Sequence, residues 1–158
     1  MGGQVADTGI LKSEGVEFVV TSTTSPQKGL ILHHGYVKRG RLVEGLSLAT
    51  LVTSEKRRKI ASNHTATHLL HFALQQVLQG SIKQAGSLVE EERFRFDFTY
   101  PKPLTALELL QIEDLVNKKI RENRPVVHYE IPLEEAQKRG DIKQFFGEKY
   151  GATVRVVD

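Results

Sequence analysis

The alternation of hydrophobic and polar residues divides the chain into a strand-rich first third and a later part that mixes helices and strands. Short β-type runs between turn-forming residues predict strands at 18–21, 30–33 and 48–52. Short strands at this spacing are typical of a small barrel or sandwich. The composition then changes, and the pattern predicts a helix from about Asn63 to Gln79 that ends near Gly80.

The later segments alternate between strand and helix patterns. Residues 93–98 alternate strictly between charged residues and phenylalanine, which predicts a strand with one aromatic and one charged face. Thr105 and Glu108 form a capping box, and the helix they open should bury a stripe made of Leu109, Ile112, Val116 and Ile120. Further strands are expected at 126–131 and 154–157, with a short helix opened by Pro132.

These elements predict an α+β protein with two parts. Residues 1–53 should form a small, partial β-barrel subdomain. Residues 54–158 should form an α/β sandwich in which helices cover a mainly antiparallel sheet.

The composition narrows the class of protein only a little. The chain has 158 residues, 39% of them hydrophobic and 26% charged, which is typical of a soluble globular protein. No apolar run approaches the ~20 residues that span a bilayer, so we expect no membrane partner. With no cysteine there is no disulfide framework, and a cytoplasmic location is the default. The net charge of +3 slightly favours an anionic partner such as nucleic acid.

The strongest candidate for chemistry is a pair of histidines, His64 and His68, spaced four residues apart. On a helix this spacing places both imidazoles on one face, where they can point at a single metal ion. His71 shares that face, and the apolar residues of the helix centre on the other side, so we expect the histidines to face away from the core. A zinc peptidase would need glutamate where Thr65 stands.

The pair alone is an incomplete metal site, since a catalytic zinc takes about three protein ligands. The other histidines, His33, His34 and His128, show no ligand spacing. Residues 84–87 have turn chemistry and are read either as a connection or as a polar pocket wall. The basic run 56–59 is read as a solvated helix face rather than an RNA site, and 2–4 and 7–9 are read as turns. The sequence contains no P-loop, dinucleotide fingerprint or nucleophile elbow.

Taken together, these segments resemble the editing region of alanyl-tRNA synthetase. The resemblance rests on five blocks that occur in the family's order: Gly2-Gly3-Gln4 with Asp7 and Gly9, residues 63–71, 84–87, 93–98 and 146–151. It implies a domain that hydrolyses serine or glycine wrongly attached to tRNA(Ala), within a parent enzyme that joins alanine to tRNA(Ala) using ATP. The implied partners are the acceptor end of tRNA(Ala) and the rest of the synthetase.

The resemblance also implies roles for individual residues. In the family, zinc is held by the two histidines of the HxxxH motif, matched here by His64 and His68, and by a later cysteine and histidine. That later pair is expected in a Cys-x-x-x-His motif beyond Asp158, which predicts that the chain is a truncated or excised segment. Thr67 would recognise the serine hydroxyl, and Gln84 would line the same pocket.

Three other interpretations stay open. A free-standing AlaX-type deacylase shares the barrel and the HxxxH motif but would include the Cys-x-x-x-His segment. The editing domain of threonyl-tRNA synthetase shares the histidine module but lacks the Gly-Gly-Gln block. A non-catalytic tRNA-binding module with a vestigial metal site is the alternative from a different class.

Overall fold

The computed structural model describes residues 3–27, 29–80, 82–140, 142 and 151–157. It confirms the α+β class, with three helices and antiparallel sheets among these residues. The chain separates into two compact units, 1–119 and 120–158, which are described separately below. The proposed subdomain boundary at residue 53 stays a prediction. Within the described residues no helix is both long and apolar enough to cross a membrane.

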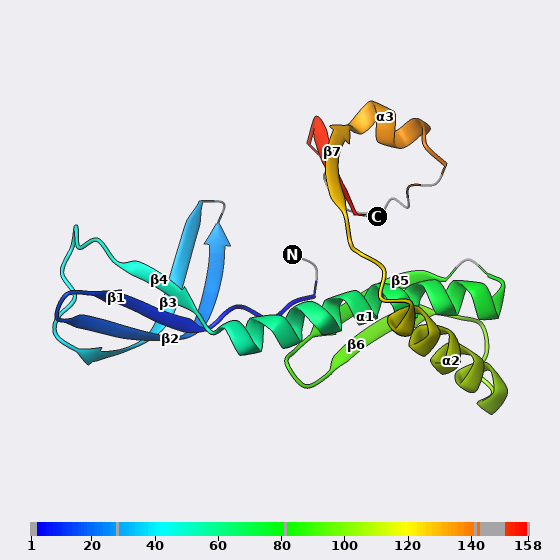
Figure 1. Ribbon diagram of the computed structural model, residues 1–158, viewed down its shortest axis with the longest axis horizontal. Helices are drawn as coiled ribbons and strands as arrows, with labels where there is room; N and C mark the ends of the chain where they lie inside the picture. Colours follow the sequence, from blue (N-terminus) through cyan, green and yellow to red (C-terminus); the bar gives the residue numbers. More distant parts are fainter. Residues whose placement is uncertain (1–2, 28, 81, 141, 143–150, 158) are drawn as a thin grey trace. The chain divides into compact units, whose positions relative to one another are not determined.

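The N-terminal part of the first unit is a four-stranded antiparallel sheet with the order β3-β2-β1-β4 (Figure 1). Its strands are β1 (Gly9–Ser13), β2 (Val16–Gln27), β3 (Leu30–Arg39) and β4 (Ala49–Val52). The three predicted strands are confirmed: β2 and β3 are longer than predicted and β4 is one residue shorter, whereas β1 was not expected. Gly9 begins β1 where it pairs with Val52, and a side chain there would collide with the carbonyl of Leu51. This close approach explains a glycine that the sequence pattern indicated only as part of a turn.

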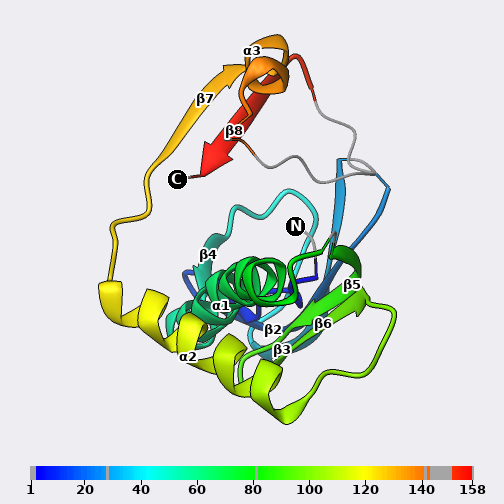
Figure 2. The ribbon, with the colours of Figure 1, turned by 90° about the vertical axis from the view of Figure 1, so that its right-hand side faces the viewer.

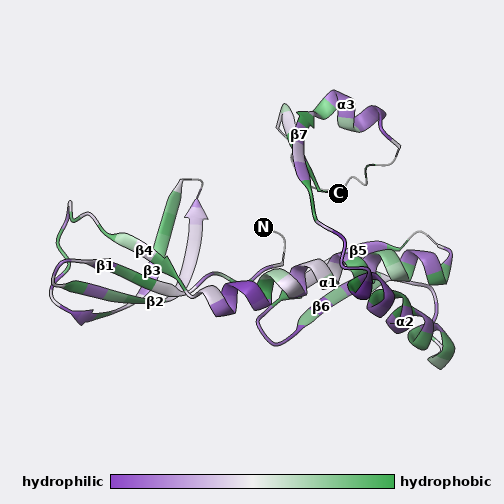
Figure 3. Cartoon of the chain, in the orientation of Figure 1, coloured by the Kyte–Doolittle hydropathy of each residue, from purple (hydrophilic) through white to green (hydrophobic). Residues whose placement is uncertain are grey.

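Helix α1 runs from Ser54 to Leu78 and begins about two and a half turns earlier than the sequence predicted. Lysine and arginine are strong helix formers, and no proline or glycine interrupts residues 54–79, so the basic run belongs to the helix. Its hydrophilic character is visible at the start of α1 in Figure 3. The helix ends at Gln79, which adopts a left-handed conformation (φ 49°) just before Gly80.

The second half of the unit packs α1 and α2 (Ala106–Glu122) with the hairpin of β5 (Lys83–Val89) and β6 (Phe94–Thr99). Figure 2 looks along α1 and shows the hairpin beside it. The predicted aromatic face of residues 93–98 is confirmed, because Phe96 and Phe98 pack into the core while Arg93 and Arg95 are exposed. The buried residues of this core are Ala73, Leu74, Leu78, Ile82 and Ile112.

The capping box of α2 is confirmed. The Thr105 backbone N–H donates to Glu108 Oε2 at 2.7 Å, and the Glu108 N–H donates back to Thr105 Oγ1 at 3.2 Å. The predicted apolar stripe is only partly right. Ile112 is buried and Val116 is partly buried, but Leu109 and Ile120 are 52% and 53% exposed. Leu115 joins the core instead, which rotates the buried stripe away from Leu109 and Ile120.

The second unit contains β7 (His128–Pro132), helix α3 (Leu133–Lys138) and β8 (Thr153–Val157). β7 and β8 pair antiparallel, and Pro132 occupies the N-cap of α3 as predicted. The strand begins at His128 rather than at residue 126. A small core forms from Ile131, Ala136 and Val156. Residues 146–150 of the block that resembles the synthetase lie outside the described residues.

Candidate functional site

The two histidines of the HxxxH motif meet on the surface of α1. His64 Nε2 and His68 Nε2 lie 3.2 Å apart, and the ring planes are inclined at 71°. The short distance follows from the i, i+4 spacing on an α-helix. The Nδ1 atom of His64 is buried and has no hydrogen-bond partner among the described residues. The pair therefore offers two ring nitrogens that converge on one point.

The surroundings of both imidazoles favour the neutral form of the ring. Burial lowers the pKa of His64, and the positive charge of Arg57 lowers it further. Burial also lowers the pKa of His68, with His64 and His71 as additional causes. A neutral imidazole keeps a lone pair on one ring nitrogen, so this environment suits metal binding or proton acceptance.

The face of α1 that carries the pair lies closer to the core than the sequence predicted. Ile60, Thr67 and Leu74 are buried on a strip beside the histidines. His64 is half-buried and His68 exposed. His71 turns toward the hairpin, where its Nε2 lies 3.2 Å from the carbonyl oxygen of Ile82 and its ring lies 5.2 Å from that of Phe96. The expectation is wrong for His71, because the aromatic face of β6 draws this edge of the helix inward, whereas His68 stays exposed.

Thr67 is the buried polar residue of α1, with only 7% of its surface exposed. Its hydroxyl donates to the carbonyl oxygen of Asn63 at 2.8 Å, one helical turn earlier. The proton of the hydroxyl is therefore already engaged, and the oxygen retains lone pairs that can accept a hydrogen bond. No described contact joins Thr67 to the histidine pair.

Gln84 lies exposed in β5, so residues 84–87 are part of a strand and not the predicted turn. The register of β5 against β6 shifts between Gln84 and Gly86, which marks a β-bulge. The extra residue brings Gln84 and Ser87 together, and Gln84 Nε2 donates to Ser87 Oγ at 3.2 Å. A bulge re-aims side chains in this way, and turn-like residues such as Ala85-Gly86 are compatible with it.

The segment before β1 is joined to the far end of β5. The Val89 N–H donates to the Gly3 carbonyl at 2.7 Å, and the Val5 N–H donates to the Val89 carbonyl at 3.0 Å. Gln4 pairs with Val89 in a parallel bridge. Gly3 has φ +77°, and a side chain there would collide with Ser87 Oγ. The close packing of Gly3 on β5 therefore requires glycine.

Arg57 connects this segment to α1, a role that the sequence did not reveal. Its Nη1 donates to Gln4 Oε1 at 2.7 Å and lies 3.6 Å from Asp7 Oδ1. Together with Val5 and Ala6, these three residues line an open groove of about 490 Å³. The only available signal was the position of Arg57 about two helical turns before His64, on nearly the same helix face.

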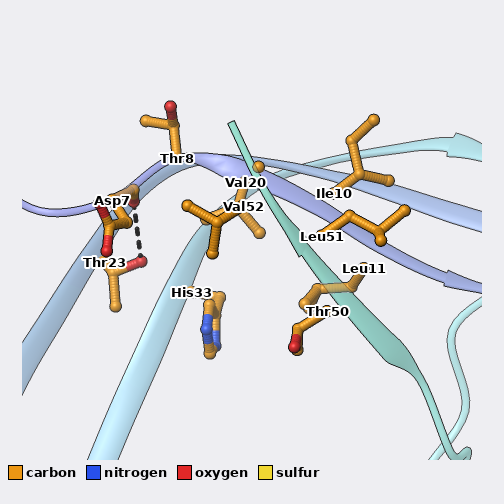
Figure 4. A pocket seen from close by; sticks show the side chains of 11 residues that line it. Asp7, Thr8, Ile10, Leu11, Val20, Thr23, His33, Thr50, Leu51 and Val52 are labelled. Atoms are coloured by element: carbon orange, nitrogen blue, oxygen red, sulfur yellow. Dashed lines mark hydrogen bonds between the residues drawn. The ribbon is translucent and has the colours of Figure 1, made fainter. Parts of the chain in front are cut away.

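A smaller hollow of about 60 Å³ lies in the four-stranded sheet (Figure 4). Apolar residues of β1 and β4 form much of its lining, together with His33 and Thr23. Thr23 Oγ1 donates to the backbone carbonyl of Asp7 at 3.3 Å, as the dashed line in Figure 4 shows. The hollow gathers no set of metal-binding side chains. Across the described residues, in fact, no group of three or more His, Asp or Glu side chains could hold a metal ion.

Comparison with known proteins gives close relatives along almost the whole chain. The chain is 49% identical over 157 residues to an alanine–tRNA ligase of Chlamydia pneumoniae and 48% identical over 156 residues to that of Chlamydia muridarum. Each match covers 99% of this chain and 18% of the relative. An alanine–tRNA ligase of Rhodopseudomonas palustris is 47% identical over 156 residues, covering 99% of the chain and 17% of that relative. No family model matches the chain.

These relatives are aminoacyl-tRNA ligases, and the α+β chain with its histidine-bearing helix is homologous to one segment of them. Its similarity to alanine–tRNA ligases over nearly its whole length is consistent with one segment of such a ligase. The chain spans about 18% of the length of the curated relatives it matches.

Proposed function

We propose that this chain is an editing domain that hydrolyses seryl-tRNA(Ala) and glycyl-tRNA(Ala). The observation that carries the proposal is the His64–His68 pair, whose nitrogens converge at 3.2 Å, in a chain homologous to alanine–tRNA ligases. The family resemblance of the surrounding blocks supports the same assignment. The parent enzyme would attach alanine to tRNA(Ala) using ATP in the cytoplasm.

An alanine-specific ligase needs such a second reaction for a physical reason. A site that accepts alanine cannot firmly exclude glycine, which is smaller, or serine, which adds one hydroxyl. Differences of this size give only about 10- to 200-fold discrimination in binding. A separate hydrolytic site supplies the accuracy that binding alone does not provide.

The geometry of the histidine pair fits two of the ligands of a zinc ion. Two nitrogens at about 2.0–2.1 Å from a tetrahedral zinc lie about 3.3 Å apart, close to the observed 3.2 Å. The same distance also fits an N–H···N hydrogen bond between neutral rings. Bound zinc would polarise an ester carbonyl or lower the pKa of a coordinated water to about 7. The remaining ligands, by the family resemblance, are a cysteine and a histidine outside these residues.

Thr67 and Gln84 would bind and orient the aminoacyl group. The lone pairs of Thr67 Oγ1 can accept the hydroxyl proton of serine, since the proton of Thr67 is already donated to Asn63. The amide of Gln84, held by Ser87, can hydrogen-bond a polar group of the substrate from the exposed side of β5. The acceptor end of tRNA(Ala) would be the partner of this surface.

Deacylation measured together with zinc content tests the proposal. A full-length ligase that contains this chain is supplied with Zn²⁺ and assayed for release of serine from seryl-tRNA(Ala) and of alanine from alanyl-tRNA(Ala). We expect preferential release of serine, and we expect His68→Ala to lose both bound zinc and activity. His128→Ala, which removes a histidine from β7, serves as the matched control and should retain both. Thr67→Val should lower the preference for serine by about tenfold, the cost of one unmade hydrogen bond in a buried site.

The alternatives give different outcomes. Zinc binding and tRNA binding without release of serine would favour a non-catalytic module. Full deacylation after removal of zinc would contradict the role of the metal while leaving the editing activity in place.

A further inference from the structure

Residues 3–8 are fixed at three points beside the start of α1. Backbone hydrogen bonds between Gly3, Val5 and Val89 fix one end to β5. At the other end the Thr53 N–H donates to the Thr8 carbonyl at 2.9 Å. Between these two ends, the side chain of Arg57 contacts both Gln4 and Asp7.

The contacts of Arg57 form the wall of the groove described above. Gln4, Asp7 and Arg57 supply its polar side chains, and Val5 and Ala6 complete its lining. Arg57 lies about two turns before His64 and about 20° from it around the helix, so the groove and the histidine pair follow one another along the same face of α1. The effect of the Arg57 charge on the pKa of His64 agrees with this proximity.

We propose that Arg57 is a positioning residue that holds Gln4–Asp7 in place, so that the resulting groove receives the aminoacylated end of the substrate beside the histidine pair. The inference rests on the proposed editing function and adds a residue outside the motifs that carry the family resemblance. Arg57 itself need not touch the reacting ester, because its donors are directed at Gln4 and Asp7.

Energetics separate this role from simple stabilisation of the fold. The side chains of Arg57 and Asp7 are 40% and 43% exposed, and exposed ion pairs contribute little to folding. The segment is also held by the backbone hydrogen bonds of Gly3, Val5 and Thr8. Loss of Arg57 should therefore leave the fold intact while it releases the side of the groove that Gln4 forms.

The test compares Arg57→Ala and Gln4→Ala with the matched control Arg58→Ala, which removes the same charge from the neighbouring helix position. In the full-length ligase that contains this chain, the deacylation of seryl-tRNA(Ala) is measured together with the affinity for 3′-seryl-amino-3′-deoxyadenosine, an amide analogue that is not hydrolysed. We expect each of the two variants to raise KM and the Kd of the analogue about tenfold, with kcat within about twofold of wild type.

Two further variants test the mechanism. The double variant Arg57→Ala/Gln4→Ala should be no worse than either single variant, because the two side chains act as one unit. Arg57→Lys should recover part of the affinity, since its ammonium can still donate to Gln4 Oε1. Arg58→Ala should stay within about twofold of wild type.

The outcomes distinguish this inference from the proposed function. If the full-length wild-type ligase binds the analogue but does not hydrolyse the ester, the proposed activity fails. The ratio of the Kd of Arg57→Ala to the Kd of wild type then still decides the role of Arg57. Three outcomes would each overturn the positioning role. The first is an equal loss of affinity for the analogue in Arg57→Ala and Arg58→Ala, and the second is additive losses of affinity in the double variant. The third is a wild-type protein that does not bind the analogue.

Discussion

At the scale of single residues, the histidine pair couples the stability of the chain to pH. The folded state lowers the pKa of His64 and of His68 from the ordinary value of 6.5, mainly through burial. In the unfolded chain both rings protonate near pH 6.5, whereas the folded state resists protonation until a lower pH. The unfolded state therefore binds more protons in this window. The stabilising contribution is present above pH 6.5 and is lost as the pH falls through the pKa values of the folded state.

We expect the urea concentration at the unfolding midpoint of the metal-free chain to decrease when the pH is lowered from about 7.5 to about 5.5. This decrease should be smaller in His64→Gln and His68→Gln. Glutamine keeps polar groups near the ring positions but does not titrate. Urea unfolding in the presence of a chelator measures the effect. The same pH dependence in wild type and both variants would show that other groups control stability in this range.

At the scale of elements, local patterns predicted most of the helices and strands, but not how residues 84–87 are used. Three features depend on neighbours in sequence and were predictable: the capping box of Thr105 and Glu108, the aromatic alternation of β6, and the strands β2, β3 and β4. Strand β1 was not predicted. The bulge at Gln84–Gly86 depends on pairing with β6, and the docking of Gly3 depends on β5. Such pairings across the chain leave no local periodicity to detect.

The histidine helix is held against the hairpin by one side chain in particular. Asn63 Nδ2 donates to the carbonyl oxygens of Glu90 and Glu91, at 2.9 and 3.1 Å, in the connection that follows β5. Lys59 reaches Glu91 and Glu92 in the same turn, but its flexible side chain is 41% exposed, so water screens these ion pairs. The two hydrogen bonds of Asn63 satisfy backbone carbonyls, so Asn63 should dominate this contact.

Asn63→Ala should lower the free energy of unfolding by about 1–2 kcal/mol, because two backbone carbonyls lose their donor. Lys59→Ala should change the urea midpoint much less. Ser62→Ala is the matched control, since Ser62 Oγ donates only to the carbonyl of Arg58 within the helix and is exposed. Urea denaturation with a common m-value compares the three. A change in Ser62→Ala as large as that in Asn63→Ala would mean that helix propensity, not the contact with the hairpin, controls the result.

At the scale of the whole molecule, the chain divides its hydrophobic burial unequally between two units. The first unit has a core that joins α1, α2 and the hairpin. In the described part of the second unit the core consists of Ile131, Ala136 and Val156, with three partly buried neighbours. Units of about 40 residues seldom bury enough apolar surface to be stable alone, and this chain has no cysteine to reinforce one. The sequence predicted the elements of this region but not its separation as a unit.

Amide hydrogen exchange should show this inequality directly. We expect the paired amides of β7 and β8 to be protected at least tenfold less than those of α1 and β5, because local opening of the second unit exposes little apolar surface. Exchange measured residue by residue at neutral pH gives both sets of amides in one experiment. The two sets should also respond differently to Ile131→Ala, which should accelerate exchange in β7 and β8 and leave α1 unchanged. Equal protection throughout, or acceleration in both units, would show that the chain unfolds as one cooperative body and that the second unit depends on contacts with the first.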